Sequence, residues 1–250
     1  MDDKNTKRDG LPLLSLLPNL VTLLGLCAGL TSIRFVMADR FDIAAGLILL
    51  AALLDGMDGQ LARRLNATSS MGAELDSLSD FLCFGVAPAL LLFQLGFQDA
   101  RGIGWICALV YASCCCLRLA RFNVMTDQEN LDPELKKNHF VGVPAPAGAL
   151  LVMLPAFLTF QGVINANDIP IIFSLYMALV GVLMISKLPT ISAKSLVIPK
   201  NRIALLFIAT AVLVGMLLTQ FWLSMILISA IYIASLIHSF IKLLQNKNKT

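Results

Sequence analysis

The chain has 250 residues, of which 58% are hydrophobic and only 14% are charged. Soluble globular proteins carry about 25% charged residues, so this composition excludes an ordinary soluble enzyme. The net charge of +3 is dispersed and forms no basic block with interleaved aromatic residues, which argues against nucleic-acid binding. The composition indicates a membrane protein whose neighbours are lipids.

Long apolar runs occupy most of the chain. A membrane-spanning helix needs about 20 mainly apolar residues, and stretches of this kind predict an all-α, polytopic bundle with about eight transmembrane helices. The expected spans are residues 18–38, 42–65, 72–96, 102–123, 143–160, 168–186, 203–219 and 222–244.

Lysine and arginine fall mainly on one side of these spans. Sixteen of the 19 lie in the terminal segments or near the junctions at 63–72, 120–142 and 187–202, whereas Arg34, Arg40 and Arg101 lie on the other side. Because positively charged loops stay in the cytoplasm, we predict a multi-pass protein of the cell's inner membrane with both termini cytoplasmic.

Acidic residues cluster within the expected membrane spans, where charged side chains are rare. A carboxylate at the bilayer centre costs about 2.5–3.5 kcal/mol on insertion scales, so a group of them indicates a functional site. The spacings of three and four residues place each aspartate pair on one face of its helix, and a short turn makes the two helices antiparallel neighbours. We therefore expect the two pairs to meet near the cytoplasmic membrane surface. The acidic residues are Asp55, Asp58, Glu74, Asp76 and Asp80, and Glu74 lies off the shared face.

Ligands that are all carboxylates suit Mg²⁺ or Mn²⁺, and four of them can hold two ions about 3.5–4 Å apart. Gly59, Ala62 and Gly72 leave room for a bulky ligand, and Arg63 can reach a phosphate. This combination predicts pyrophosphate binding and in-line displacement at phosphorus. A transporter in which the same acids carry cations or protons remains the alternative.

Written out, the segment from Asp55 to Asp80 resembles the signature of the CDP-alcohol phosphotransferases, D-x-x-D-G-x-x-A-R-x8-G-x3-D-x3-D, and matches all its fixed positions. The resemblance implies a six-helix core, two divalent cations, a CDP-linked lipid substrate, transfer of a phosphatidyl group to an alcohol with release of CMP, and a homodimer. It also implies that Asp80 is the general base. The metal ligands would be Asp55, Asp58, Asp76 and Asp80, and the nucleotide pyrophosphate would lie against Gly59, Ala62, Arg63 and Gly72.

Three further stretches resemble the bacterial phosphatidylserine synthase subfamily, namely residues 72–88, 118–123 and 140–147. This resemblance implies that CDP-diacylglycerol reacts with L-serine by a metal-assisted in-line displacement to give phosphatidylserine and CMP. Glycerol 3-phosphate, an inositol phosphate or choline remain alternative acceptors. The subfamily pattern usually has Leu and Ser or Thr where this chain has Val143 and Ala145.

A zwitterionic acceptor needs a cation for its carboxylate and an acceptor for its ammonium. Arg118 and Arg121 are candidates for the first role and Asn123 for the second, with lipid phosphate binding or membrane anchoring as the alternative. Asn19 and Thr22 open the first span, where they either bind cytidine or cap the helix. Weaker candidates for phosphate binding are Lys136, Lys137 and His139.

The expected organisation has three parts. Residues 1–17 form a cytoplasmic N-terminal and interfacial segment, residues 18–186 form the six-helix catalytic core, and residues 187–250 add two transmembrane helices and a cytoplasmic tail.

Overall fold

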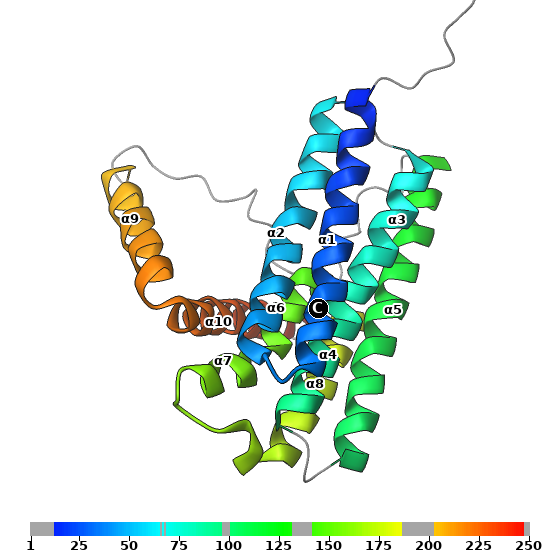
Figure 1. The fold of residues 1–250 in the computed structure, drawn as a ribbon. Coiled ribbons are helices and arrows are strands. Elements are labelled where there is room, and N and C mark those ends of the chain that lie inside the picture. Colours follow the sequence, from blue (N-terminus) through cyan, green and yellow to red (C-terminus); the bar gives the residue numbers. More distant parts are fainter. Residues whose placement is uncertain are drawn as a thin grey trace, which may run out of the picture.

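A computed structural model describes residues 13–65, 67, 69–96, 101–131, 142–186 and 203–247. All regular elements in these ranges are helices (Figure 1). In chain order they are α1 (Leu13–Met37), α2 (Phe41–Leu65), α3 (Ser70–Asp80), the π-helix η1 (Phe81–Val86), α4 (Ala87–Gly96), α5 (Arg101–Leu131), α6 (Ala145–Val152), α7 (Leu154–Phe160), the 3₁₀-helix η4 (Ala166–Asp168), α8 (Pro170–Ile185), α9 (Ile203–Thr219) and α10 (Phe221–Lys247).

The helices are long and apolar enough to make this an integral membrane protein. Four helical stretches have the length and hydropathy to cross a bilayer, and α8 and part of α9 are shorter apolar helices. The prediction of an all-α polytopic bundle is therefore confirmed. The four long stretches are Leu16–Met37, Ser70–Gly96, Gly102–Met125 and Phe221–Ile241.

Two boundaries differ from the expected ones. The first helix begins at Leu13 rather than near residue 18, and it contains Pro18 in its second turn, where proline removes one backbone hydrogen bond of the helix. The expected span 143–160 is divided at Met153 into α6 and α7, and a proline follows at the second position of α7. Residues 1–12, 132–141 and 187–202, with Lys136, Lys137 and His139, lie outside the described residues.

Helices α1 and α2 form an antiparallel hairpin, and α3 runs beside α1 (Figure 1). The turn is closed by a hydrogen bond from the Arg40 N–H to the Phe35 carbonyl, 3.0 Å, with Asp39 in the left-handed region at φ 54°. The Ser32 hydroxyl donates to the Ala44 carbonyl at 2.9 Å and joins the two helices at a fully buried point. The hairpin thus holds its two helices in a fixed register.

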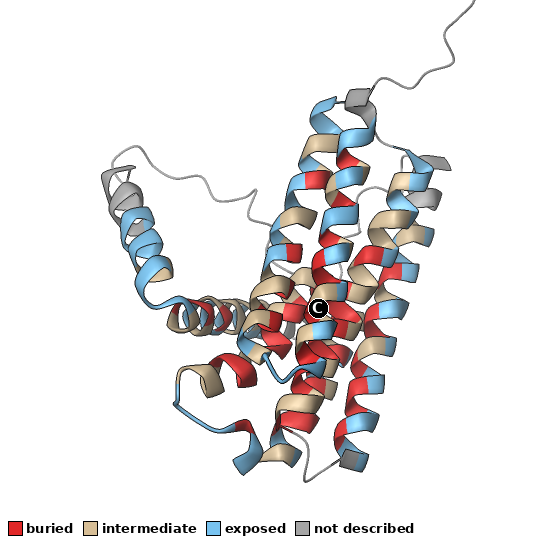
Figure 2. Cartoon of the chain, in the orientation of Figure 1, coloured by how far each residue is buried: buried red, intermediate tan, exposed pale blue. Residues whose placement is uncertain are grey.

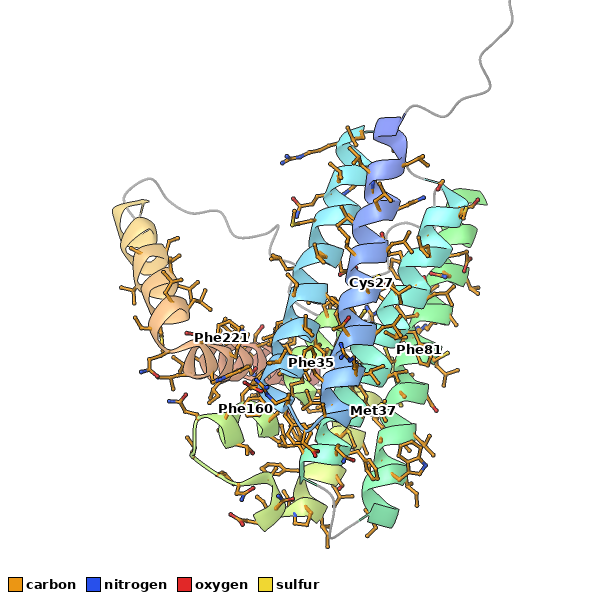
Figure 3. The ribbon with its side chains drawn as sticks, in the orientation of Figure 1. Cys27, Phe35, Met37, Phe81, Phe160 and Phe221 are labelled. Atoms are coloured by element: carbon orange, nitrogen blue, oxygen red, sulfur yellow. The ribbon has the colours of Figure 1, made fainter. Side chains whose placement is uncertain are left out.

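The segment 70–96 is one continuous helical rod that contains a wide π-turn directly after Asp80. The Tyr111 hydroxyl on α5 donates to the Phe84 carbonyl inside this turn at 2.8 Å. Close packing continues through Gly85, whose added Cβ would lie 3.2 Å from the Cys115 side chain. Figure 3 shows Phe81 on the side of the rod that faces α5. Contacts with α5 therefore hold the π-turn in place.

Helix α8 packs closely against α5 through a glycine. A Cβ on Gly181 would lie 2.9 Å from the Tyr111 Cα, so only glycine permits this separation of the two backbones. On the other face of α8, the Tyr176 hydroxyl donates to the Leu151 carbonyl of α6 at 2.8 Å. Helix α8 thus links α5 to α6.

The C-terminal helices join the bundle through α10. Trp222 at its start lies 4.7 Å from Phe160 and 5.9 Å from Phe157 between ring centroids, and Figure 3 shows Phe160 and Phe221 at this junction. In Figure 1, α10 lies across the direction of the long helices, whereas α9 stands apart from them. Figure 2 shows the buried residues concentrated where α4, α6, α7 and α8 meet the long helices, and the described part of α9 largely exposed.

The close contact at Gly181 gives a test of the fold. We expect Gly181→Ala to lower the apparent melting temperature in detergent, because overpacking of a close contact costs about 1–3 kcal/mol. The matched control is Gly46→Ala in α2, where an added Cβ would meet no atom within 4 Å. Thermal unfolding followed by size-exclusion chromatography measures both, and equal melting temperatures for the two variants would contradict the packing of α5 on α8.

Candidate metal and phosphate site

The site lies where α1, α2 and α3 come together. The connection from α2 to α3 is short, and Ser69 caps α3 by accepting a hydrogen bond from the Gly72 N–H at 3.0 Å. A Cβ on Gly72 would lie 2.9 Å from Asn19 Oδ1, so glycine allows α3 to approach α1 closely. The start of α3 is therefore fixed against both neighbours.

Three of the four predicted ligands meet in one cluster. Carboxylate oxygens of Asp55, Asp76 and Asp80 all lie within 4.8 Å of one another, and all three side chains are half-buried. The Asp55 carboxylate is within hydrogen-bonding reach of both others. Three like charges in apolar surroundings repel each other and lose hydration, so this arrangement favours a bound cation. Oxygen donors of this kind suit a hard divalent ion.

Asp58 has a different partner. Its side chain is buried, with 4% of its surface exposed, and Oδ2 accepts a hydrogen bond from the Thr22 hydroxyl at 2.6 Å. Asp58 thus lies outside the three-residue cluster, although it lines the same cavity as Asp76. Its role as a fourth metal ligand stays a prediction.

An open cavity of about 230 Å³ leads to these carboxylates from the end of the bundle where α2 joins α3. Its walls include all six residues that the sequence suggested for the nucleotide. A gap of about 10 Å³ lies further in and shares Thr22, Asp58 and Asp76 with the cavity. The six nucleotide candidates are Asn19, Thr22, Gly59, Ala62, Arg63 and Gly72, and the other lining residues are Pro18, Asp58, Ala67, Ser69, Ala73 and Asp76.

Gly59 of α2 leaves this cavity open. An added Cβ on Gly56 or Gly59 would meet no atom within 4 Å, so neither glycine is required for helix packing. Gly59 lines the cavity, and Arg63 lies one turn further along the same helix with its side chain exposed. Because a glycine leaves the helix backbone uncovered and the arginine supplies a positive charge, this surface is suited to bind a phosphate group.

The three acceptor candidates on α5 have different surroundings. Asn123 accepts a hydrogen bond from the Ser77 hydroxyl of α3 at 3.1 Å, which occupies its side-chain oxygen. Arg121 is exposed. Arg118 is half-buried, its charge acts on Asp80, and its Nε atom is buried without a hydrogen-bond partner. Among these three residues, only Arg118 has a described interaction with one of the aspartates, Asp80.

Sequence reasoning missed two contributors to this region. Ser69 lines the cavity and caps α3, and its position three residues before Gly72 fits an N-cap motif. Tyr232 of α10 interacts electrostatically with Arg118. A single tyrosine in a largely apolar helix was the signal in the sequence that could have indicated this residue. Hydropathy alone does not show which neighbouring helix the tyrosine faces.

Comparison with known proteins places this geometry in a family. Residues 15–185 match the family described as CDP-alcohol phosphatidyltransferase. A relative from Mycobacterium leprae is 48% identical over 140 residues, which is 56% of this chain and 46% of that protein. Relatives from Mycobacterium bovis and Helicobacter pylori strain 26695 are 38% and 37% identical, covering 80% and 70% of this chain and 69% and 71% of those proteins.

All three relatives are named CDP-diacylglycerol–serine O-phosphatidyltransferase. The chain thus spans about half the length of the first of these relatives and rather more than two thirds of the others. Since the family match covers most of its residues, including every residue of the cavity and of the carboxylate cluster, this chain belongs to the CDP-alcohol phosphatidyltransferase family.

Proposed function

We propose that this protein transfers the phosphatidyl group of CDP-diacylglycerol to the hydroxyl of L-serine, giving phosphatidylserine and CMP. The observation that carries this proposal is a cavity that is lined by the phosphate-binding candidates and reaches Asp76, one of the three clustered carboxylates. The names of the relatives support the two substrates. The enzyme is a phosphatidyltransferase that works inside a membrane protein bundle.

The nucleotide end of the lipid substrate occupies the open cavity. Arg63 pairs with the pyrophosphate, while Gly59 and Gly72 let its oxygens approach the helix backbones. Asn19 of α1 lines the cavity next to Gly72, where its amide can hydrogen-bond the cytosine base. Thr22 contributes through Asp58, whose carboxylate it orients by the 2.6 Å hydrogen bond.

Two divalent cations, Mg²⁺ or Mn²⁺, complete the site. Asp55, Asp76 and Asp80 would hold one ion between them, and Asp58 with its neighbours on α2 and α3 would hold the second. When bound, such ions neutralise phosphate charge and make CMP a better leaving group. The carboxylate donors and their mutual separation fit hard divalent ions.

Asp80 accepts the proton of the attacking hydroxyl. It lies at the inner end of α3, away from the entrance, and lines the 10 Å³ gap together with the other three aspartates. The serine oxygen forms a bond to phosphorus as the bond from phosphorus to the CMP oxygen breaks, and the hydroxyl proton passes to the Asp80 carboxylate. Arg118, whose charge acts on Asp80, binds the serine carboxylate nearby.

We further propose that the protein lies in the inner membrane with its termini and this site on the cytoplasmic side. The uneven distribution of lysine and arginine supports that orientation. A homodimer and the division into a core of residues 18–186 and a C-terminal unit of residues 187–250 are proposals that rest on the family resemblance.

The proposed reaction has a direct test. Purified protein in mixed micelles with CDP-diacylglycerol, labelled serine and Mg²⁺ or Mn²⁺ should form labelled phosphatidylserine and an equal amount of CMP. Product from glycerol 3-phosphate but not from serine would contradict the acceptor. Cation flux into liposomes without any lipid product would instead support a transporter.

The metal cluster is tested by binding rather than activity. We expect Asp76→Asn to weaken Mn²⁺ binding by roughly tenfold or more, because it removes one charged ligand from the cluster. Glu74→Gln, on the exposed face of the same helix, should bind Mn²⁺ like the wild type. Mn²⁺ titration followed by electron paramagnetic resonance measures the affinity of both variants. An equal loss of Mn²⁺ affinity in Asp76→Asn and Glu74→Gln would show that the cluster does not bind the ion.

A substitution at Gly59 tests contact with the nucleotide without disturbing the packing of the helices. Gly59→Ala should raise the KM for CDP-diacylglycerol by roughly tenfold, because the new methyl group would project into the cavity that the nucleotide occupies. Its melting temperature should match that of Gly46→Ala on the same helix, since both positions have open space around them. Unchanged kinetics would show that the nucleotide lies elsewhere.

A further inference from the structure

The chain contains three tyrosines, and two of their hydroxyl groups have a clear structural task. Tyr111 donates to the Phe84 carbonyl and Tyr176 to the Leu151 carbonyl, each at 2.8 Å and each across a helix interface. The hydroxyl oxygen of Tyr232 is also buried but has no hydrogen-bond partner. A buried hydroxyl without a partner destabilises the folded protein, so its presence here calls for a ligand.

A second unpaired atom lies in the same region. Among side chains that the structure describes, the buried polar atoms without a partner are Tyr232 Oη and Arg118 Nε. Arg118 and Tyr232 interact electrostatically with each other, and Arg118 also interacts with Asp80. The two unpaired atoms therefore come from α5 and α10, and Arg118 is the residue that connects them with the proposed general base.

The chemistry of the pair selects its ligand. A guanidinium N–H and a phenolic O–H are both donors, so together they suit an anionic oxygen, either a carboxylate or a phosphate. The described lining of the nucleotide cavity comes from α1, α2, α3 and the α2–α3 connection, and includes no residue of α5 or α10. The phosphates bind on that side of the cluster, which leaves Arg118 and Tyr232 to the acceptor.

We propose that the Tyr232 hydroxyl and the Arg118 Nε–H together bind the carboxylate of the acceptor amino acid. Helix α10 lies beyond residues 15–185, the part that matches the family, so a helix outside the matched segment completes the acceptor site. This inference rests on the proposed transfer to serine and adds to it a specificity-determining residue from the C-terminal helix. Helix α10 packs against the core through Trp222, whereas α9 stands apart.

Tyr232→Phe removes only the hydroxyl oxygen and tests the inference. We expect the KM for serine to rise roughly tenfold or more, because a hydrogen bond to a charged group is lost. The KM for CDP-diacylglycerol should stay within about twofold of the wild-type value. The melting temperature without serine should not fall, since the hydroxyl has no partner in the protein. The stabilisation of the protein by added serine should decrease.

Tyr176→Phe is the matched control because it removes a hydroxyl with a structural hydrogen bond. It should lower the melting temperature and leave the KM for serine unchanged. Arg118→Lys is a second test that does not depend on the folding of the Tyr232 variant. It keeps the charge but removes the Nε–H, and it should show the same separation of the two KM values.

These experiments distinguish a failure of the proposed transfer to serine from a failure of the role proposed for Tyr232 and Arg118. Wild-type protein that forms no phosphatidylserine would overturn the proposed function, and the inference with it. With an active wild type, unchanged KM values in Tyr232→Phe would overturn the inference alone. A higher KM for CDP-diacylglycerol with an unchanged KM for serine would assign the pair to a lipid phosphate and also overturn it.

Discussion

The crowding of three carboxylates in an apolar bundle is the constraint on which the rest of this structure depends. Asp55, Asp76 and Asp80 place oxygens within 4.8 Å of one another, where mutual repulsion and lost hydration oppose folding unless cations are bound. The bundle resists this repulsion through fixed contacts around the cluster. Gly72 brings α3 against Asn19 of α1, and the buried hydrogen bond between α1 and α2 holds the hairpin that carries Asp55.

The π-turn after Asp80 serves the same purpose from the inner side. A π-turn adds a residue to the helical repeat and rotates the following side chains around the axis, and such turns often occur at functional sites. Here it separates a polar stretch that faces the cluster from the apolar α4, which enters the core. The hydrogen bond from Tyr111 to the Phe84 carbonyl supports the turn where its own backbone bonding is irregular.

The proposed chemistry divides the bundle into two sides. Helices α1, α2 and α3 form the proposed cavity for the nucleotide and its phosphates, whereas α5 and α10 supply two unpaired donors, of which Arg118 interacts with Asp80. In-line displacement at phosphorus requires the serine hydroxyl to attack from the side opposite the CMP leaving group, and donors outside the nucleotide cavity would allow that approach. This division also gives the C-terminal helices unequal roles, because α10 packs on the core and α9 contacts mainly α10.

Sequence alone determined the class of protein and the composition of the site. Hydropathy located the helices because a bilayer requires long apolar runs, and the spacing of the aspartates placed Asp76 and Asp80 on one face because an α-helix repeats every 3.6 residues. Tertiary structure decided which partner each side chain has. In the folded chain Asp58 is hydrogen-bonded to Thr22 and Asn123 to Ser77, and Arg118 interacts electrostatically with Asp80 and Tyr232. These pairings depend on how helices rotate and cross, and hydropathy reports that a residue is buried without reporting what it faces.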